Sequence, residues 1–202
     1  IRYYGLSDMP AWVGAKAAAI AAERGVPGPI AMQLEYSLVA RDVEAEHFPA
    51  ARDAGMGIMP WSPLAGGFLT GKYERDDTSD TGRLSGANPF GDSKFTDRNW
   101  DILDTARNIA GEVERPVAQV ALVWTLAQPG VTSTLIGASK VSQIESNVAA
   151  TEFELSADQL ARLAEASAPT PGFSASLTSR DTRRMIHGGH TVSGWDDQAK
   201  TF

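Results

Sequence analysis

Short apolar runs alternate with longer segments of helical period along most of this 202-residue chain. The short runs predict strands, and the longer segments predict helices. The strands are expected over 1–6, 30–36, 57–62 and 132–138, and the helices over 10–24, 42–54, 97–113, 117–128, 142–149 and 156–167. Pro10 opens the first helix, Gly25 and Gly55 end the first two, and Ser142 and Ser156 are the expected N-caps of the last two. Strands joined by helical crossovers pair in parallel, so the fold class is α/β and ligand groups gather where the strands end.

The turn after the third expected strand carries the strongest chemical signal. Residues 57–72 read GIMPWSPLAGGFLTGK, in which Gly66, Gly67 and Gly71 lead to Lys72 beside the aromatic Trp61. Glycines let backbone N–H groups approach an anion, and a lysine can neutralise it. The pattern predicts a phosphate-binding loop, and a glycine-rich surface turn is the alternative.

A second turn of the same kind follows the fourth expected strand. Residues 134–147 read TLIGASKVSQIESN, where the apolar run ends at Gly137 and a helix begins near Ser142. The positive end of a helix dipole attracts anions. Gln143 and Asn147 are four residues apart and share one helix face. An ordinary capped helix is the alternative, but two such turns at strand ends favour a common anionic ligand.

Composition narrows the classes of partner. The chain is 43% hydrophobic and 21% charged, which suffices for a buried core. Its 25 acidic and 18 basic residues give a net charge of −7, which argues against nucleic acid and anionic membrane surfaces as partners. The chain has no cysteine, which excludes disulfides and thiolate chemistry and fits a cytoplasmic protein.

Other candidate chemistry is weaker. His187 and His190 in HGGH have a spacing seen in metal sites, but no third ligand lies near them in the sequence, so we expect a plain loop and no metal. Ser62 has no His or Asp placed for a catalytic triad. Tyr36 either faces the site or packs in the core. Residues 74–98 and 169–202 have no sustained period and are expected to be irregular.

Six segments together resemble the aldo-keto reductases in order and spacing. They are GLSDMPAW at 5–12, QLEYSL at 33–38, PWSPLAGGFLTGKY at 60–73, GRLSGANPF at 82–90, ALVWTLAQPGVTSTLIGAS at 121–139 and QIESNVAA at 143–150. The chain is most similar to the bacterial and potassium-channel-β-like branch of the family. This resemblance implies a (β/α)8 TIM barrel that binds NADPH in an extended form, without a Rossmann domain, and reduces the carbonyl group of a small aldehyde or ketone.

The resemblance covers only part of the family's barrel. Residues 1–168 correspond to its last four β/α units, and 169–202 to a tail that shapes the substrate pocket. The family's catalytic Asp, Tyr, Lys and His lie in the first four units, so no catalytic residue is carried over. We expect the chain, which begins at Ile1 within a strand motif and looks like a fragment, to be inactive alone. Its uncovered strand edges call for the N-terminal half of the barrel or another chain, and favour oligomers.

The resemblance also implies the roles of cofactor-binding residues. Trp61 matches the aromatic that stacks on the nicotinamide, and Ser7, Asp8 and Gln33 match the residues that bind its carboxamide. Asp8 stands where Asn is usual, so it can accept but not donate a hydrogen bond there. The pyrophosphate loop corresponds to Ser62, Pro63, Leu64, Gly66, Leu69, Gly71 and Lys72, with Arg83 closing over it. The adenosine site corresponds to Gly137, Ser139, Lys140, Gln143 and Asn147.

Two functions from different classes remain open at this point. The first is an NADPH-dependent aldo/keto reductase, of which this chain carries the cofactor-binding half. The second is a non-catalytic NADP(H)-binding module that senses redox state or regulates a partner. Ser139 and Lys140 would contact the 2′-phosphate that distinguishes NADPH from NADH, although many relatives have arginine at position 139.

Overall fold

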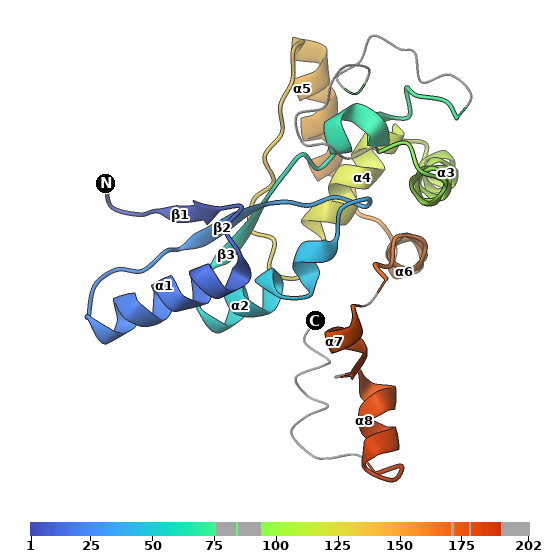
Figure 1. Cartoon of the computed structure of the whole chain (residues 1–202). Coiled ribbons are helices and arrows are strands. Elements are labelled where there is room, and N and C mark those ends of the chain that lie inside the picture. Colours follow the sequence, from blue (N-terminus) through green and yellow to red (C-terminus); the bar gives the residue numbers. More distant parts are fainter. Residues whose placement is uncertain (76–83, 85–93, 171, 178, 191–202) are drawn as a thin grey trace. The chain divides into compact units, whose positions relative to one another are not determined.

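The computed structural model of the chain describes residues 1–75, 84, 94–170, 172–177 and 179–190 (Figure 1). The chain forms two compact units, 1–168 and 169–202. Strands of the first unit are β1 (Gly5–Ser7), β2 (Ala31–Glu35) and β3 (Gly57–Trp61). Its helices are α1 (Ala11–Glu23), α2 (His47–Asp53), α3 (Asp97–Glu112), α4 (Val117–Leu126), α5 (Val141–Val148) and α6 (Ala157–Ala166), with short 3-10 turns η1 (Asp42–Glu44), η2 (Ala65–Thr70) and η3 (Ala149–Glu152). The second unit contains α7 (Phe173–Leu177) and α8 (Arg180–Ile186).

The three strands form a parallel sheet in the order β1–β2–β3. Helices α1 and α2 cover one face of it (Figure 1). Side chains on that face, such as Met32, Leu34 and Ile58, are buried, whereas the alternate residues Gln33 and Met59 are only partly buried. With period 2, the partly buried residues share the second face of the sheet, which no described helix covers, as expected for part of a barrel.

The expected fourth strand, 132–138, is not formed as a strand, which corrects the sequence prediction. The segment still follows β3, because the N–H of Thr132 donates to the Ile58 carbonyl at 2.9 Å and the N–H of Leu135 to the Pro60 carbonyl at 2.8 Å. Pro60 has no N–H to return to the segment, so the ladder is interrupted there. Only an isolated parallel bridge between Ile58 and Val131 remains.

A larger core lies where η2, α3, α4 and α6 meet. Its fully buried side chains include Phe68, Leu103, Ile109, Trp124 and Leu163. Side-chain caps begin both α3 and α6. The Thr96 hydroxyl accepts from the Asn99 N–H, and Ser156, the predicted N-cap of α6, forms a capping box with Gln159. Among the described residues, no helix is long and apolar enough to cross a membrane.

Three other helix predictions need correction. The segment 42–54 forms η1 and α2 rather than one helix, because Pro49 lies in the first turn of α2 and Pro is compatible only with such a position. Helix α5 begins at Val141 with Lys140 as its N-cap, so Ser142 lies inside the helix. The tail contains two short helices instead of irregular chain. The Ser179 hydroxyl caps α8 by accepting from the Thr182 N–H.

Tyr36 packs in the core and does not face the open side of the sheet. Its hydroxyl donates to Glu44 Oε1 at 2.6 Å, and the Arg41 guanidinium donates to both oxygens of the same carboxylate. Arg41 also donates to the Ala164 carbonyl, and it lies over the Trp124 ring at 5.1 Å. Burial, and then the bond to Glu44, raise the pKa of Tyr36, so its hydroxyl stays protonated at neutral pH.

The Arg41 network gives the first testable prediction. Arg41→Ala should lower the free energy of unfolding by roughly 2–4 kcal/mol, because it leaves the Glu44 carboxylate without its cation and removes the link to α6. The control is Arg24→Ala, which removes an exposed guanidinium at the end of α1 and should change stability by less than about 0.5 kcal/mol. Urea unfolding monitored by circular dichroism measures both, and equal midpoints for the two variants would contradict the prediction.

Candidate functional site

An open cavity of about 700 Å³ lies between the turn after β3 and the start of α5. Two chain segments supply nearly all of its wall, 61–72 and 135–147, and α4 adds Ala118. Both segments leave the sheet at the C-terminal end of β3 or beside it. In parallel sheets this end is where ligands bind, because the loops there are free to vary without disturbing the core. The two glycine-containing turns predicted from the sequence therefore face one cavity.

The loop after β3 owes its shape to residues with positive φ. Gly66 and Gly67 have φ values of 67° and 100°, conformations that only glycine adopts without strain. The Gly66 N–H donates to the Ser62 hydroxyl at 3.1 Å, and the Gly67 N–H donates to the Leu64 carbonyl at 2.9 Å. Both N–H groups already donate hydrogen bonds within the loop. The positive charge that would attract an anion must therefore come from another part of the cavity wall.

Lys72 supplies that charge. Its aliphatic stem passes over Gly67, where an added Cβ would lie 3.4 Å from Lys72 Cε. The ammonium lies 4.6 Å from the centroid of the Tyr73 ring. The lysine side chain therefore lies next to Gly67, and it lines the cavity. No carboxylate lines the cavity in the part of the chain that the structure describes, which makes the wall suitable for an anion.

The opposite wall contains the N-terminus of α5. Gln143 Oε1 accepts from the N–H groups of Ser139 and Lys140 at 2.9 and 3.3 Å, which holds the first turn of the helix together. The positive end of the α5 dipole adds to the positive potential that Lys72 supplies from the loop on the other side of the cavity. Asn147 lies one turn further along and also lines the cavity. Polar amide groups and a helix terminus thus face the loop across the cavity.

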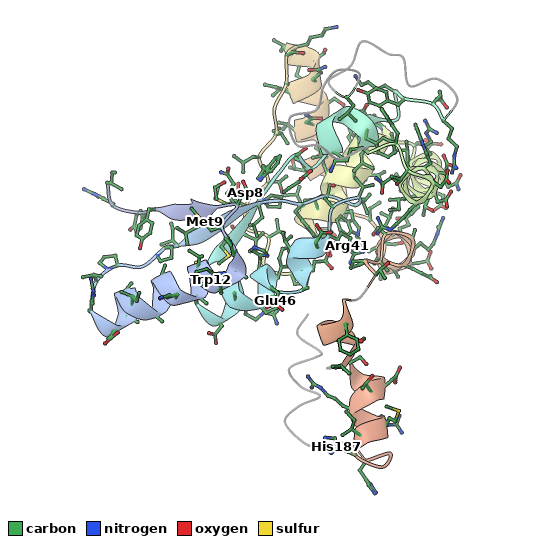
Figure 2. The ribbon with its side chains drawn as sticks, viewed as in Figure 1. Asp8, Met9, Trp12, Arg41, Glu46 and His187 are labelled. Atoms are coloured by element: carbon green, nitrogen blue, oxygen red, sulfur yellow. The ribbon has the colours of Figure 1, made fainter. Side chains whose placement is uncertain are left out.

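Four further predicted residues meet at the ends of β1, β2 and β3. The Trp61 indole N–H donates to Asp8 Oδ1 at 3.0 Å, and the Ser7 hydroxyl is 3.0 Å from Asp8 Oδ2 and 3.5 Å from Gln33 Oε1. Asp8 directly follows β1 (Figure 2). Its φ is 49°, and in this conformation its carboxylate reaches the Trp61 indole. Trp61 also lines the large cavity, so it connects this cluster to the cavity wall that contains Lys72 and the N-terminus of α5.

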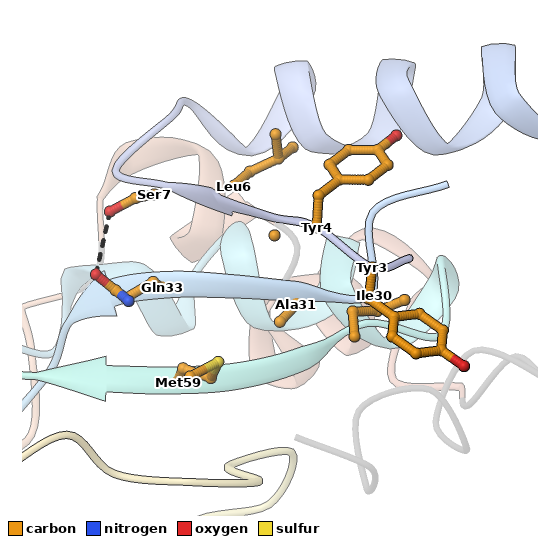
Figure 3. Close-up of a pocket in the computed structure, with 9 residues that line it drawn as sticks. Tyr3, Tyr4, Leu6, Ser7, Ile30, Ala31, Gln33 and Met59 are labelled. Atoms are coloured by element: carbon orange, nitrogen blue, oxygen red, sulfur yellow. Dashed lines mark hydrogen bonds between the residues drawn. The ribbon is translucent and has the colours of Figure 1, made fainter. Parts of the chain in front are cut away.

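A second, smaller hollow of about 290 Å³ lies on the uncovered face of the sheet. Ser7 and Gln33 line it together with Tyr3, Ala31 and Met59 (Figure 3). Gly5 and Ala31 are in register on β1 and β2, and their small size leaves the space that this hollow occupies. Because Ser7 and Gln33 belong to both, this hollow extends the Ser7–Asp8–Gln33–Trp61 cluster along the sheet.

The structure brings most predicted residues together. The large cavity is lined by Trp61, Ser62, Pro63, Leu64, Gly66, Lys72, Gly137, Ser139, Gln143 and Asn147. Leu69 is fully buried in the core, because η2 turns it away from the loop surface. Gly71 and Lys140 flank the cavity in sequence without being part of its wall, and Arg83 lies outside the described residues.

Several lining residues escaped prediction. They are Thr70, Ala118, Leu135, Ile136, Ala138 and Ser146. Helical period could have found Ser146, which lies four residues after Ser142 on the cavity side of α5. Ala118 reaches the cavity only through the packing of α4 against η2 and α5, which no local pattern reveals. In the described part of the chain, no group of three His, Cys, Asp or Glu residues could hold a metal ion.

Comparison with known proteins adds independent information. Residues 1–168 match the aldo/keto reductase family. The chain is 34% identical to an uncharacterized oxidoreductase of Bacillus subtilis over 85% of this chain and 50% of the relative. It is 35% identical to a probable voltage-gated potassium channel subunit beta of Arabidopsis thaliana over 74% of this chain and 47% of the relative.

A third relative is a probable aldo-keto reductase of Glycine max, 32% identical over 82% of this chain and 46% of the relative. The chain thus spans about half the length of the relatives that it matches. The family's TIM-barrel fold agrees with the α/β architecture and the one-sided parallel sheet found here. From the match over residues 1–168, the chain belongs to the aldo/keto reductase family.

Proposed function

We propose that the intact protein is an NADPH-dependent reductase of small aldehydes or ketones, and that this chain supplies the last four β/α units of its barrel. The cavity of about 700 Å³ carries the proposal. Its wall combines Lys72, a helix N-terminus and an aromatic side chain, and it lacks carboxylates among the described residues. A dinucleotide needs these features: a partner for its phosphates and a flat surface for its ring.

In this proposal each part of NADPH has its own group of residues. Lys72 and the loop 62–72 would hold the pyrophosphate, and Ser139, Gln143 and Asn147 the adenosine end. Trp61 would support the nicotinamide, with Ser7, Asp8 and Gln33 at its edge. When bound, NADPH supplies the hydride for carbonyl reduction. This chain's residues would orient the nicotinamide ring and anchor the phosphates.

The proton for the product alcohol would come from outside this chain. Tyr36 and Tyr73 are fully buried in the core, where the Tyr73 hydroxyl accepts from the Leu84 N–H, and Tyr3 and Tyr4 precede β1, at the end of that strand opposite Asp8. We propose that the other half of the barrel provides the Tyr and Lys needed as the general acid and its neighbour, and covers the open face of the sheet. That half would be the N-terminal part of the same protein or another chain.

A second function has a specific observation in its favour. One relative is named as a probable voltage-gated potassium channel subunit beta. That name describes a subunit of a channel and not an enzyme. The corresponding proposal is a non-catalytic NADP(H)-binding module that regulates a partner. The two proposals share the cofactor site and differ in turnover: the assembled reductase oxidises NADPH when an aldehyde is added, whereas the regulatory module binds the nucleotide without consuming it.

Tryptophan fluorescence tests the shared cofactor site. NADP⁺ should quench part of the chain's emission, because a nicotinamide stacked on Trp61 provides a path for electron transfer from the excited indole. Trp61→Phe should abolish that component while keeping a flat surface. Trp12→Phe is the matched control, since Trp12 is exposed on α1 and does not line the cavity.

The outcome separates two roles of Trp61. Four other tryptophans contribute to the emission, so the comparison of the two variants decides the result. Quenching that is lost in Trp61→Phe and retained in Trp12→Phe supports the site. Quenching that is equal in the wild type and in Trp61→Phe would remove the indole from the nucleotide-binding surface.

A further inference from the structure

The contact between Asp8 and Trp61 places a negative charge at the edge of the aromatic surface. Asp8 Oδ1 accepts from the indole N–H at 3.0 Å, and the Ser7 hydroxyl donates to Oδ2 at the same distance. The positive φ of Asp8, 49°, aims the carboxylate at the tryptophan. Both oxygens are held, so the charge has a fixed position relative to the ring, which itself lines the large cavity.

This arrangement discriminates between ligands by charge. The face of an indole is already electronegative and attracts cations. A carboxylate bonded to the indole N–H adds to the electron density of the ring and contributes its own negative potential, which falls with distance as Coulomb's law requires. A flat cationic ring stacked on Trp61 is therefore stabilised relative to a neutral ring of the same shape.

We propose that the Asp8–Trp61 pair makes this site prefer the oxidised nucleotide, NADP⁺, over NADPH; the inference rests on the proposed function. The nicotinamide ring carries a positive charge in NADP⁺ and none in NADPH, while the phosphates and adenosine are identical. The ratio of the two dissociation constants therefore isolates the ring from all other contacts. By retaining the oxidised form, the pair would make the release of NADP⁺ slower than it would be beside a neutral residue.

Asp8→Asn tests the pair with little structural change. Asparagine has nearly the same shape, tolerates positive φ, and keeps an oxygen that can accept from the indole N–H. Its NH2 group would face the Ser7 hydroxyl, which can accept instead of donate, so the contact to Ser7 is kept in reverse while the negative charge is lost. Asp53→Asn is the matched control, because it removes one exposed carboxylate at the end of α2, on the covered face of the sheet. Calorimetric titration of each purified chain with NADP⁺ and with NADPH gives the ratio of dissociation constants.

The expected result is a change in that ratio toward NADPH by about three- to tenfold in Asp8→Asn, and no change in Asp53→Asn. An unchanged ratio in Asp8→Asn, with both nucleotides still bound, would overturn this inference and leave the proposed function standing. Absence of binding for both nucleotides in the wild type would overturn the proposed function and this inference together.

Discussion

Replacing Lys72 with alanine is expected to weaken NADPH binding by about ten- to a hundredfold. Lys72 is the cationic side chain among the described residues that line the large cavity, and the backbone N–H groups of Gly66 and Gly67 are engaged within the loop. A charge-assisted bond to phosphate contributes roughly 1.5–3 kcal/mol, and each 1.4 kcal/mol is a factor of ten. Calorimetric titration measures the loss directly.

Lys16→Ala is the matched control for this prediction. Lys16 is an exposed residue of α1, so its replacement changes the net charge by the same amount away from the cavity. Raising the salt concentration should also narrow the difference between wild type and Lys72→Ala, because ions screen an exposed charge pair. Equal NADPH affinity for wild type and Lys72→Ala would remove Lys72 from the nucleotide site.

The second large effect concerns catalysis: the 202-residue chain alone should show no carbonyl reduction above background. Hydride transfer to a carbonyl creates an alkoxide, and without a positioned acid that step is unfavourable. Of the four tyrosines, Tyr36 and Tyr73 are buried in the core, and Tyr3 and Tyr4 precede β1, at the end of that strand opposite the Asp8–Trp61 contact. The assay follows NADPH oxidation with para-nitrobenzaldehyde as a reactive substrate.

The same preparation should also oligomerise, and light scattering measures this. Exposed apolar side chains lie around β1, an edge strand of the sheet, and on α5. They include Tyr3, Tyr4 and Ile30 next to β1, and Val141, Ile144 and Val148 on α5. Uncovered strand edges and apolar faces favour association. A monodisperse monomer with steady turnover would contradict both expectations and require a different acid, such as His187 or His190 in the tail.

The sequence predicts those elements of the fold whose signals are local. Caps and glycine stops define α1 and α6 to within a residue or two, because Pro10, Gly25 and Ser156 act on their immediate neighbours. The missing fourth strand depends on Pro60, which belongs to the adjacent strand and interrupts pairing from across the sheet. Such a cross-strand effect cannot be read from the apolar run at 132–138 itself.

In the candidate site, too, some features follow from neighbouring residues in the sequence, and others depend on how distant segments pack. Its two turns were predictable because glycines, Lys72 and Trp61 lie close together in the sequence. The bond between Asp8 and Trp61 joins residues 53 positions apart, so it depends on the parallel register of three strands. Leu69, predicted to belong to the pyrophosphate loop, is buried for a similar reason: η2 turns its side chain into a core formed largely by α3 and α4.

A crystal structure of the chain with NADP⁺ bound tests the central claim most directly, since that claim is the location of the cofactor. The account predicts the pyrophosphate beside Lys72, the adenosine beside Gln143 and Asn147, and the nicotinamide against Trp61. All of these residues line the cavity of about 700 Å³. A nucleotide bound elsewhere on the chain, with that cavity filled only by water, would contradict the account.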